Sequence, residues 1–136
     1  MSSIQLLKVK SNQEKLSKLC QTVKYHFDRH ERLLIAVPND EVARYLDNLL
    51  WRFPPESFLP HKVVSKESDF PIVITTTMEN LNRASILINL LPGANPICLQ
   101  FDTIYEIYDE TDPVKENLSR ERLTAYKALG CFSLKA

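Results

Sequence analysis

The apolar run Leu33-Leu34-Ile35-Ala36-Val37, which ends at Pro38, decides the fold. A continuous run of this kind is typical of a strand that is covered on both faces, as the central strand of a parallel sheet is. Before it, residues 4–9 predict another strand, and residues 12–30 predict a helix because apolar side chains recur every three or four positions. After it, Asn39 can cap a second helix. This order of strands and helices indicates an α/β domain with right-handed crossovers.

The rest of the chain continues in the same style. Residues 51–61 hold three prolines, which predict a loop rather than a helix. The remaining predicted elements are strands at residues 70–76, 85–91 and 97–108, a last helix from Asp112 to Gly130, and a short edge strand at residues 131–134. With 136 residues the chain is long enough for one core, and we expect a single domain spanning residues 1–136.

Glycine is scarce, and this limits the chemistry of the fold. The two glycines, Gly93 and Gly130, lie far apart, so no glycine-rich phosphate-binding loop can form. The junctions at residues 9–12 and 37–40, where an α/β sheet would bind a nucleotide, contain no glycine. The expected fold class is therefore α/β: a Rossmann-like three-layer fold with a mostly parallel central sheet flanked by helices, without a nucleotide-binding glycine loop. A small α/β enzyme or nucleotide-binding protein acting at the carboxyl ends of the strands stays as an alternative function.

Charge and cysteine usage bear on location and partners. Seventeen Lys and Arg residues balance seventeen Asp and Glu residues, and because sequence-independent DNA binding relies on net positive charge, we expect any DNA contact to be indirect. Cys20, Cys98 and Cys131 are too widely spaced to predict a disulfide framework or a CxxC metal site. No window approaches the ~18 apolar residues that cross a bilayer, and the first ten residues lack a signal-peptide core. We expect a cytoplasmic protein without a membrane partner.

No catalytic group, metal site or cofactor is expected from the remaining motifs. His26 and His30 stand four positions apart on the first predicted helix, but no third ligand is near them, so we interpret them as part of a solvated helix surface. His61 follows Pro60 in the predicted loop and has no serine or cysteine nucleophile nearby in sequence, which does not favour a general base.

The last predicted helix offers the first candidate binding surface. Its core-facing residues are expected to be Val114, Leu118, Ala125 and Leu129, with Tyr126 beside them. Another face, at spacings i, i+3, i+4 and i+7, then carries Arg120, Leu123, Thr124 and Lys127. Two cations that flank an exposed leucine fit an acidic peptide with an apolar end, whereas the alternative is an ordinary solvated face.

The proline-rich loop offers the second. Four large apolar side chains gather in it: Trp51, Phe53, Phe58 and Leu59. Aromatic anchors on a loop stiffened by proline lose little entropy on binding, so this segment suits a protein contact. The alternative is that the same side chains fold back as a hydrophobic lid on the sheet.

Several motifs together resemble the chi subunit family of bacterial DNA polymerase III. They are Leu33-Leu34-Ile35-Ala36, Tyr45-Leu46-Asp47-Asn48-Leu49-Leu50-Trp51, Glu56-Ser57-Phe58-Leu59-Pro60-His61, Ser85-Ile86-Leu87-Ile88-Asn89-Leu90, and a C-terminal pattern of Glu106, Asp109, Arg120-Glu121-Arg122, Ala125-Tyr126-Lys127 and Gly130. The LDxxLW and SFxPH elements are the most specific, and the co-linear match covers nearly the whole chain.

The resemblance implies a function. Chi is an accessory protein of the clamp-loader assembly that binds the acidic, phenylalanine-ended tail of single-stranded DNA-binding protein, while catalysis belongs to other subunits. It implies that the final helix around Arg120 receives the tail. It also implies that the region of Trp51 and Phe58 contacts the partner subunit psi or a repair helicase. Relatives often carry tyrosine and lysine where this chain has Leu123 and Thr124. No cofactor is implied.

Overall fold

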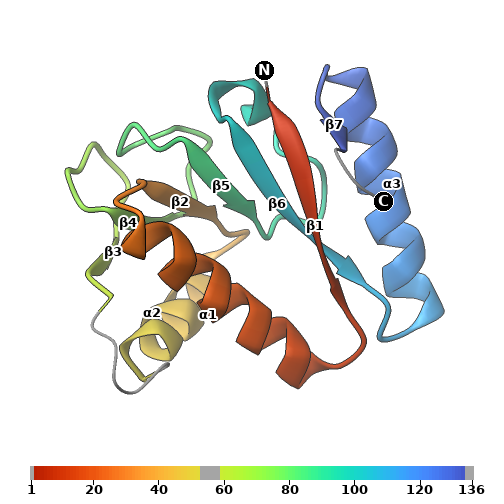
Figure 1. Ribbon diagram of the computed structural model, residues 1–136, viewed down its shortest axis with the longest axis horizontal. Helices are drawn as coiled ribbons and strands as arrows, with labels where there is room; N and C mark the ends of the chain where they lie inside the picture. The colour runs from red at the N-terminus through yellow and green to blue at the C-terminus, as the bar shows by residue number, and fades with distance from the viewer. Residues whose placement is uncertain (1, 53–58, 134–136) are drawn as a thin grey trace.

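The computed structural model describes residues 2–52 and 59–133, which form one twisted sheet with helices on both faces (Figure 1). The strands are β1 (Ser3–Val9), β2 (Leu33–Ala36), β3 (His61–Val63), β4 (Ile72–Thr75), β5 (Ile86–Asn89), β6 (Thr103–Asp109) and β7 (Phe132–Ser133). The helices are α1 (Asn12–Asp28), α2 (Asp40–Arg52), the short 3₁₀ helix η1 (Cys98–Gln100) and α3 (Pro113–Ala128). The strand order is β3-β4-β2-β5-β6-β1-β7, and each of these pairings is parallel.

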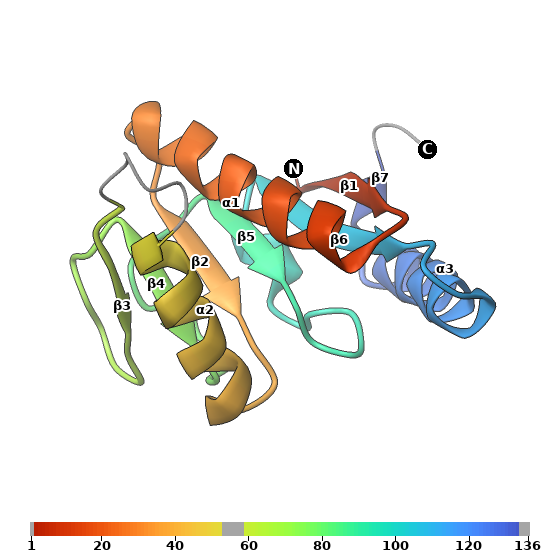
Figure 2. The same cartoon turned by 90° about the horizontal axis from the view of Figure 1, so that it is seen from below.

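The central strand β2 is buried on both faces, as the apolar run predicts. Leu33 and Ile35 pack into the core on the side of α1 and α2, whereas Leu34 and Ala36 pack into the core on the side of α3. Figure 2 shows α1 and α3 on opposite sides of the sheet. Each core also takes side chains from the neighbouring strands β4 and β5. The predicted Rossmann-like three-layer α/β fold is therefore confirmed.

Local signals in the sequence set the ends of the helices. The Ser11 hydroxyl accepts a hydrogen bond from the backbone N–H of Glu14 at 3.0 Å, and this caps α1. The Asn39 side chain accepts from the Val42 N–H at 2.9 Å in the same way. At the end of α3, Gly130 adopts a φ of 92°, a conformation that glycine tolerates better than other residues.

Two predicted elements differ from the structure. Strand β3 forms beside β4, at a place where prolines predict only a loop. The predicted strand at residues 97–108 begins later, at Thr103, because residues 98–100 form η1 first. Among the described residues, no helix combines the length and apolar character needed to cross a membrane.

Helix α3 is rotated relative to its predicted orientation. Val114 and Leu118, which are expected in the core, are 70% and 45% exposed, and Ala125 and Leu129 are exposed as well. The side chains that face the sheet instead belong to Ser119, Arg122, Leu123 and Tyr126. The physical reason is a set of hydrogen bonds that Ser119, Arg122 and Tyr126 make with β6, which outweighs the burial of a few aliphatic side chains.

Candidate functional site

A groove lies between α3 and the strands β1 and β6, and it is the strongest candidate for a binding site. Its volume is about 600 Å³. Three of the four helix residues singled out from the sequence line it: Arg120, Leu123 and Lys127. The fourth, Thr124, is exposed outside this lining, where its hydroxyl donates to the Arg120 carbonyl at 3.3 Å.

The groove combines apolar and cationic side chains. The other lining residues are Ile4, Leu6, Lys8, Tyr108, Glu110, Glu116 and Phe132. The Lys8 ammonium lies 5.9 Å from the centre of the Tyr108 ring. Lys8, Arg120 and Lys127 thus bring three cations to the groove against the carboxylates of Glu110 and Glu116. Apolar surface beside cations suits a short acidic peptide that also carries an apolar side chain.

Arg120, near the middle of α3, forms only a weak ion pair within the protein. The Arg120 Nη1 lies 3.5 Å from Oε2 of Glu116, one helical turn earlier, and both side chains are partly exposed. An exposed ion pair of this kind contributes at most about 1 kcal/mol. Arg120 can therefore exchange Glu116 for a carboxylate of a bound ligand at little cost.

Sequence reasoning missed the strand residues of the groove, Lys8 and Tyr108. The alternation of Ile4, Leu6 and Lys8 does indicate that these three share one face of a strand. What the sequence does not reveal is that β1 lies between β6 and β7, which brings that face beside α3. The order of the strands is thus the missing information.

The second predicted surface is only partly described, because Phe53 and Phe58 lie outside the described residues. Trp51, in the last turn of α2, is 53% exposed, and its ring centre lies 4.5 Å from that of His61. Leu59 is 1% exposed and packs in the core beneath α1 and α2, so its assignment to a binding surface is corrected. It turns inward because α2 and β3 close over an apolar layer at this point.

Two of the three histidines, His26 and His61, are bonded within the protein, whereas His30 is exposed. His61 is buried, with Nδ1 2.6 Å from the Leu59 carbonyl oxygen and Nε2 3.1 Å from the Asp47 carbonyl oxygen. His26 is also buried, which contradicts its interpretation as part of a solvated surface, and its ring contacts Glu31 and the Tyr105 hydroxyl. Among residues 2–52 and 59–133, no group of three or more potential ligands is placed to hold a metal ion.

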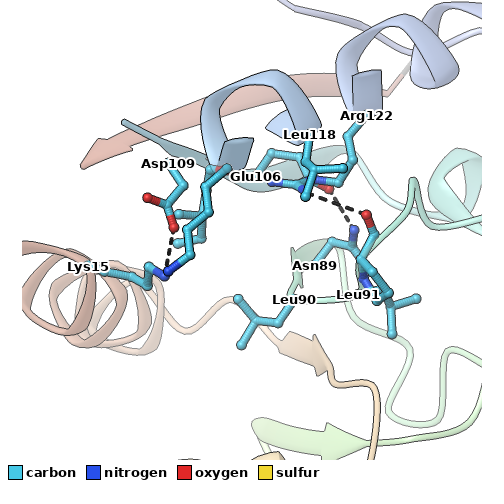
Figure 3. A pocket seen from close by; sticks show the side chains of 11 residues that line it. Lys15, Asn89, Leu90, Leu91, Glu106, Asp109, Leu118 and Arg122 are labelled. Atoms are coloured by element: carbon cyan, nitrogen blue, oxygen red, sulfur yellow. Dashed lines mark hydrogen bonds and ion pairs between the residues drawn. The ribbon is translucent and has the colours of Figure 1, made fainter. Parts of the chain in front are cut away.

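A second pocket, of about 330 Å³, lies at the carboxyl ends of β5 and β6 (Figure 3). This is where the alternative function would place a ligand. Here the Lys15 ammonium lies 2.8 Å from the Asp109 carboxylate. Burial alone would raise the pKa of Asp109, but its hydrogen bonds with Lys15 and Thr111 outweigh burial and lower the pKa to about 2.

A buried carboxylate, Glu106, forms one wall of this pocket. It accepts hydrogen bonds from Asn89 at 2.6 Å and Tyr126 at 2.5 Å, and its other oxygen lies 2.9 Å from Nε of Arg122. Burial raises the pKa of Glu106 against these stabilising partners. Burial and the negative charge of Glu106 together raise the pKa of Tyr126. These polar groups bond to one another across the pocket wall and hold α3 on the sheet. Their hydrogen bonds are therefore made within the protein and not with a ligand.

Comparisons with known proteins agree on one family. A family model described as "DNA polymerase III chi subunit, HolC" matches residues 1–133. The chain is 29% identical over 115 residues to the DNA polymerase III subunit chi of Escherichia coli (strain K12), a match that covers 82% of this chain and 78% of that relative. The DNA polymerase III subunit chi of Haemophilus influenzae (strain Rd) is 28% identical over 102 residues, a match that covers 73% of this chain and 68% of that relative. The DNA polymerase III subunit chi of Pseudomonas aeruginosa (strain PAO1) is 28% identical over 92 residues, which covers 67% of this chain and 64% of that relative.

Proposed function

The chain belongs to the DNA polymerase III chi subunit family, and from this premise we propose that it links the clamp-loader assembly to single-stranded DNA-binding protein by holding that protein's acidic C-terminal tail. Family membership makes the chain an accessory subunit of a DNA polymerase complex. The tail would occupy the groove between α3, β1 and β6. The observation that carries this proposal is the convergence of Arg120, Leu123 and Lys127 on that groove.

Each chemical feature of such a tail has a counterpart in the groove. Arg120 and Lys127 pair with the tail carboxylates, and Arg120 exchanges its ion pair with Glu116 for the ligand. Leu123 is half-buried against the core, so it offers a fixed apolar surface for the terminal phenylalanine. Since the contacts are largely ionic and near solvent, binding weakens as salt concentration rises.

The two departures from the family pattern are offset by neighbouring strands. The resemblance implies an aromatic ring and a cation where this chain has Leu123 and Thr124. In the same groove, Tyr108 of β6 brings a ring and Lys8 of β1 brings an ammonium group. Strand residues thus provide the aromatic ring and the cation that the helix lacks. We propose further that the chain contacts DNA only through its partner protein.

The surface around Trp51 is proposed to bind a second protein, either psi or an alternative replication or repair partner. The exposed half of the Trp51 side chain supports this, because a large aromatic group at the end of a helix is a typical interface anchor. Other clamp-loader subunits are reached only through that partner. Leu59 takes no direct part, since it lies in the core.

An NMR titration of the full chain with a peptide copying the tail tests the proposal. We expect the amide signals of Arg120, Leu123 and Lys127 to shift most. A peptide without its terminal phenylalanine should shift the Leu123 signal less than the full peptide does. Arg120→Ala should weaken binding by roughly five- to tenfold, which corresponds to about 1 kcal/mol. Arg44→Ala is the matched control, because Arg44 is an exposed arginine on the distant helix α2.

The titration also separates this function from the alternative. Shifts confined to residues around Lys15, Asn89 and Asp109 would place the ligand at the strand ends and reject the tail site. An unchanged spectrum at saturating peptide concentration would reject the tail-binding function as a whole.

A further inference from the structure

Two cysteines that are far apart in the sequence lie side by side in the core beneath α3. The Sγ of Cys131 is 2.8 Å from the Sγ of Cys98, and both side chains are fully buried. Both are free thiols. The third cysteine, Cys20, is buried in the core on the opposite face of the sheet. We propose that Cys98 and Cys131 are a modification site, at which a peroxide converts the two thiols into an intramolecular disulfide.

The backbone holds both residues in place for this bond. The Cys98 N–H donates to the Asn95 carbonyl at 3.2 Å, and the Cys98 carbonyl accepts from the Ser2 hydroxyl at 3.1 Å. The Cys131 N–H donates to the Tyr126 carbonyl at 2.9 Å. A disulfide requires a sulfur separation of about 2.05 Å. The two sulfurs therefore need to approach by less than one ångström, which rotation about the side-chain bonds can supply.

Access to the thiols comes from the edge of the sheet. Burial raises the pKa of Cys98 to about 12, so its sulfur stays protonated and is not the thiol that reacts first with peroxide. Strand β7 has only two residues, pairs with β1 at the sheet edge, and directly follows Cys131. A two-residue edge strand, paired on one side only, opens locally at low free-energy cost. Such an opening uncovers Cys131 first, since its neighbours Gly130 and Phe132 are already exposed.

The chemistry then takes two balanced steps. The Cys131 thiolate attacks one oxygen of hydrogen peroxide, the O–O bond breaks, and the leaving hydroxide takes up a proton as water, which leaves Cys131 as a sulfenic acid. When β7 closes again, the Cys98 sulfur attacks the sulfenic sulfur, the S–S bond forms and the S–O bond breaks. The departing hydroxide takes the Cys98 proton as a second water. Two thiols lose two electrons, and one peroxide is reduced to two waters.

The bond would tie η1 to the end of α3. The closed loop contains β6 and all of α3, which line one side of the groove and supply Glu106, Arg122 and Tyr126 of the buried network. Such a cross-link restricts the unfolded chain and raises the midpoint of thermal unfolding, by roughly 5 to 15 °C for a loop of this length. This property is independent of tail binding.

Peptide mapping of the full, reduced chain after exposure to hydrogen peroxide tests the site. The protein is unfolded in denaturant, remaining thiols are alkylated, the protein is digested without reductant, and the fragments are weighed. We expect one fragment pair that joins Cys98 to Cys131 and lacks two hydrogen atoms, with Cys20 fully alkylated as an internal control. The unfolding midpoint should rise on oxidation and return after treatment with dithiothreitol.

Alkylation of all three cysteines after peroxide treatment would overturn the proposal, as would links to Cys20 at similar yield. Cys131→Ser should leave Cys98 alkylated and abolish the rise in the midpoint, whereas Cys20→Ser should retain both the link and the rise. Should Cys131→Ser not fold, the map of the unmodified sequence decides alone, because it shows directly which sulfurs are joined.

Discussion

Replacing Asp109 by asparagine should reveal how strongly the end of β6 is anchored to α1. The Asp109 side chain is 9% exposed, and one of its oxygens lies 2.8 Å from the Lys15 ammonium. Its other oxygen accepts from the Thr111 N–H at 3.0 Å and from the Thr111 hydroxyl at 2.5 Å. Asparagine keeps the size of the side chain but removes the charge that Lys15 neutralises.

The size of the effect follows from the pKa. The pKa of Asp109 falls from 3.8 to about 2 in the folded protein, and each unit is equivalent to about 1.4 kcal/mol. The ionised carboxylate therefore contributes about 2 kcal/mol to the free energy of unfolding at neutral pH. Because the folded pKa is the lower one, the unfolded chain binds the proton more tightly. The contribution is present above pH 4 and disappears as the pH falls through 2.

Urea denaturation at neutral pH and at a series of pH values down to 2 measures this contribution. Asp109→Asn should lower the free energy of unfolding by about 2 kcal/mol at pH 7, and the difference from the original protein should vanish near pH 2. The control is Asp69→Asn, since Asp69 is 89% exposed, lies 3.3 Å from Arg83, and should cost less than about 0.5 kcal/mol. Equal losses in the two variants, or a loss at Asp109 that does not change with pH, would refute the reasoning.

Further predictions concern the buried network, the two surfaces and salt. Tyr126→Phe should cost about 1 to 2 kcal/mol in urea denaturation, because the Asn95 N–H loses an acceptor at 3.1 Å and Glu106 loses a donor. Leu59→Ala should cost about 2 to 4 kcal/mol by leaving a core cavity, whereas Trp51→Ala should cost much less and should abolish capture of the second partner in a pull-down assay. In fluorescence anisotropy, the tail peptide should bind several-fold more weakly in about 300 mM than in about 50 mM sodium chloride, and an unchanged affinity would contradict the ionic contacts.

Apolar patterning predicts most of the fold because the buried face of a regular element must repeat with that element's period. Residues 33–37 indicate the central strand in this way. Ser11 or Asn12 as a cap predicts the start of α1, where the structure uses Ser11, and Asp112 predicts the start of α3. Strand β3 is harder to predict, since three residues are too few to establish a period and only His61 among them is buried. It forms because the exposed edge of β4 offers backbone hydrogen bonds.

The candidate site is predictable only in part, and α3 gives the reason. A pattern of aliphatic side chains places Val114 and Leu118 inward, but polar groups decide the orientation of this helix. Glu106 lies buried in the middle of β6, and an unpaired carboxylate there would be costly, so Arg122 and Tyr126 must turn toward it. Which polar side chains meet in the folded protein depends on the order of the strands, and the spacing of apolar residues along one helix does not reveal it.

The same network changes the meaning of the neutral formal charge. Zero net charge indicates no basic surface. Two ion pairs, however, lie near the carboxyl ends of the strands: Arg122 with Glu106, and Lys15 with Asp109. Because the two charges of each pair lie within about 3 Å of each other, they largely cancel and add little to the potential outside. What a ligand meets in the groove is Lys8, Arg120 and Lys127 against the two carboxylates Glu110 and Glu116, a small excess of positive charge at one place. A surface of this kind attracts a short acidic segment of a protein and gives no support for a long run of nucleic-acid phosphates.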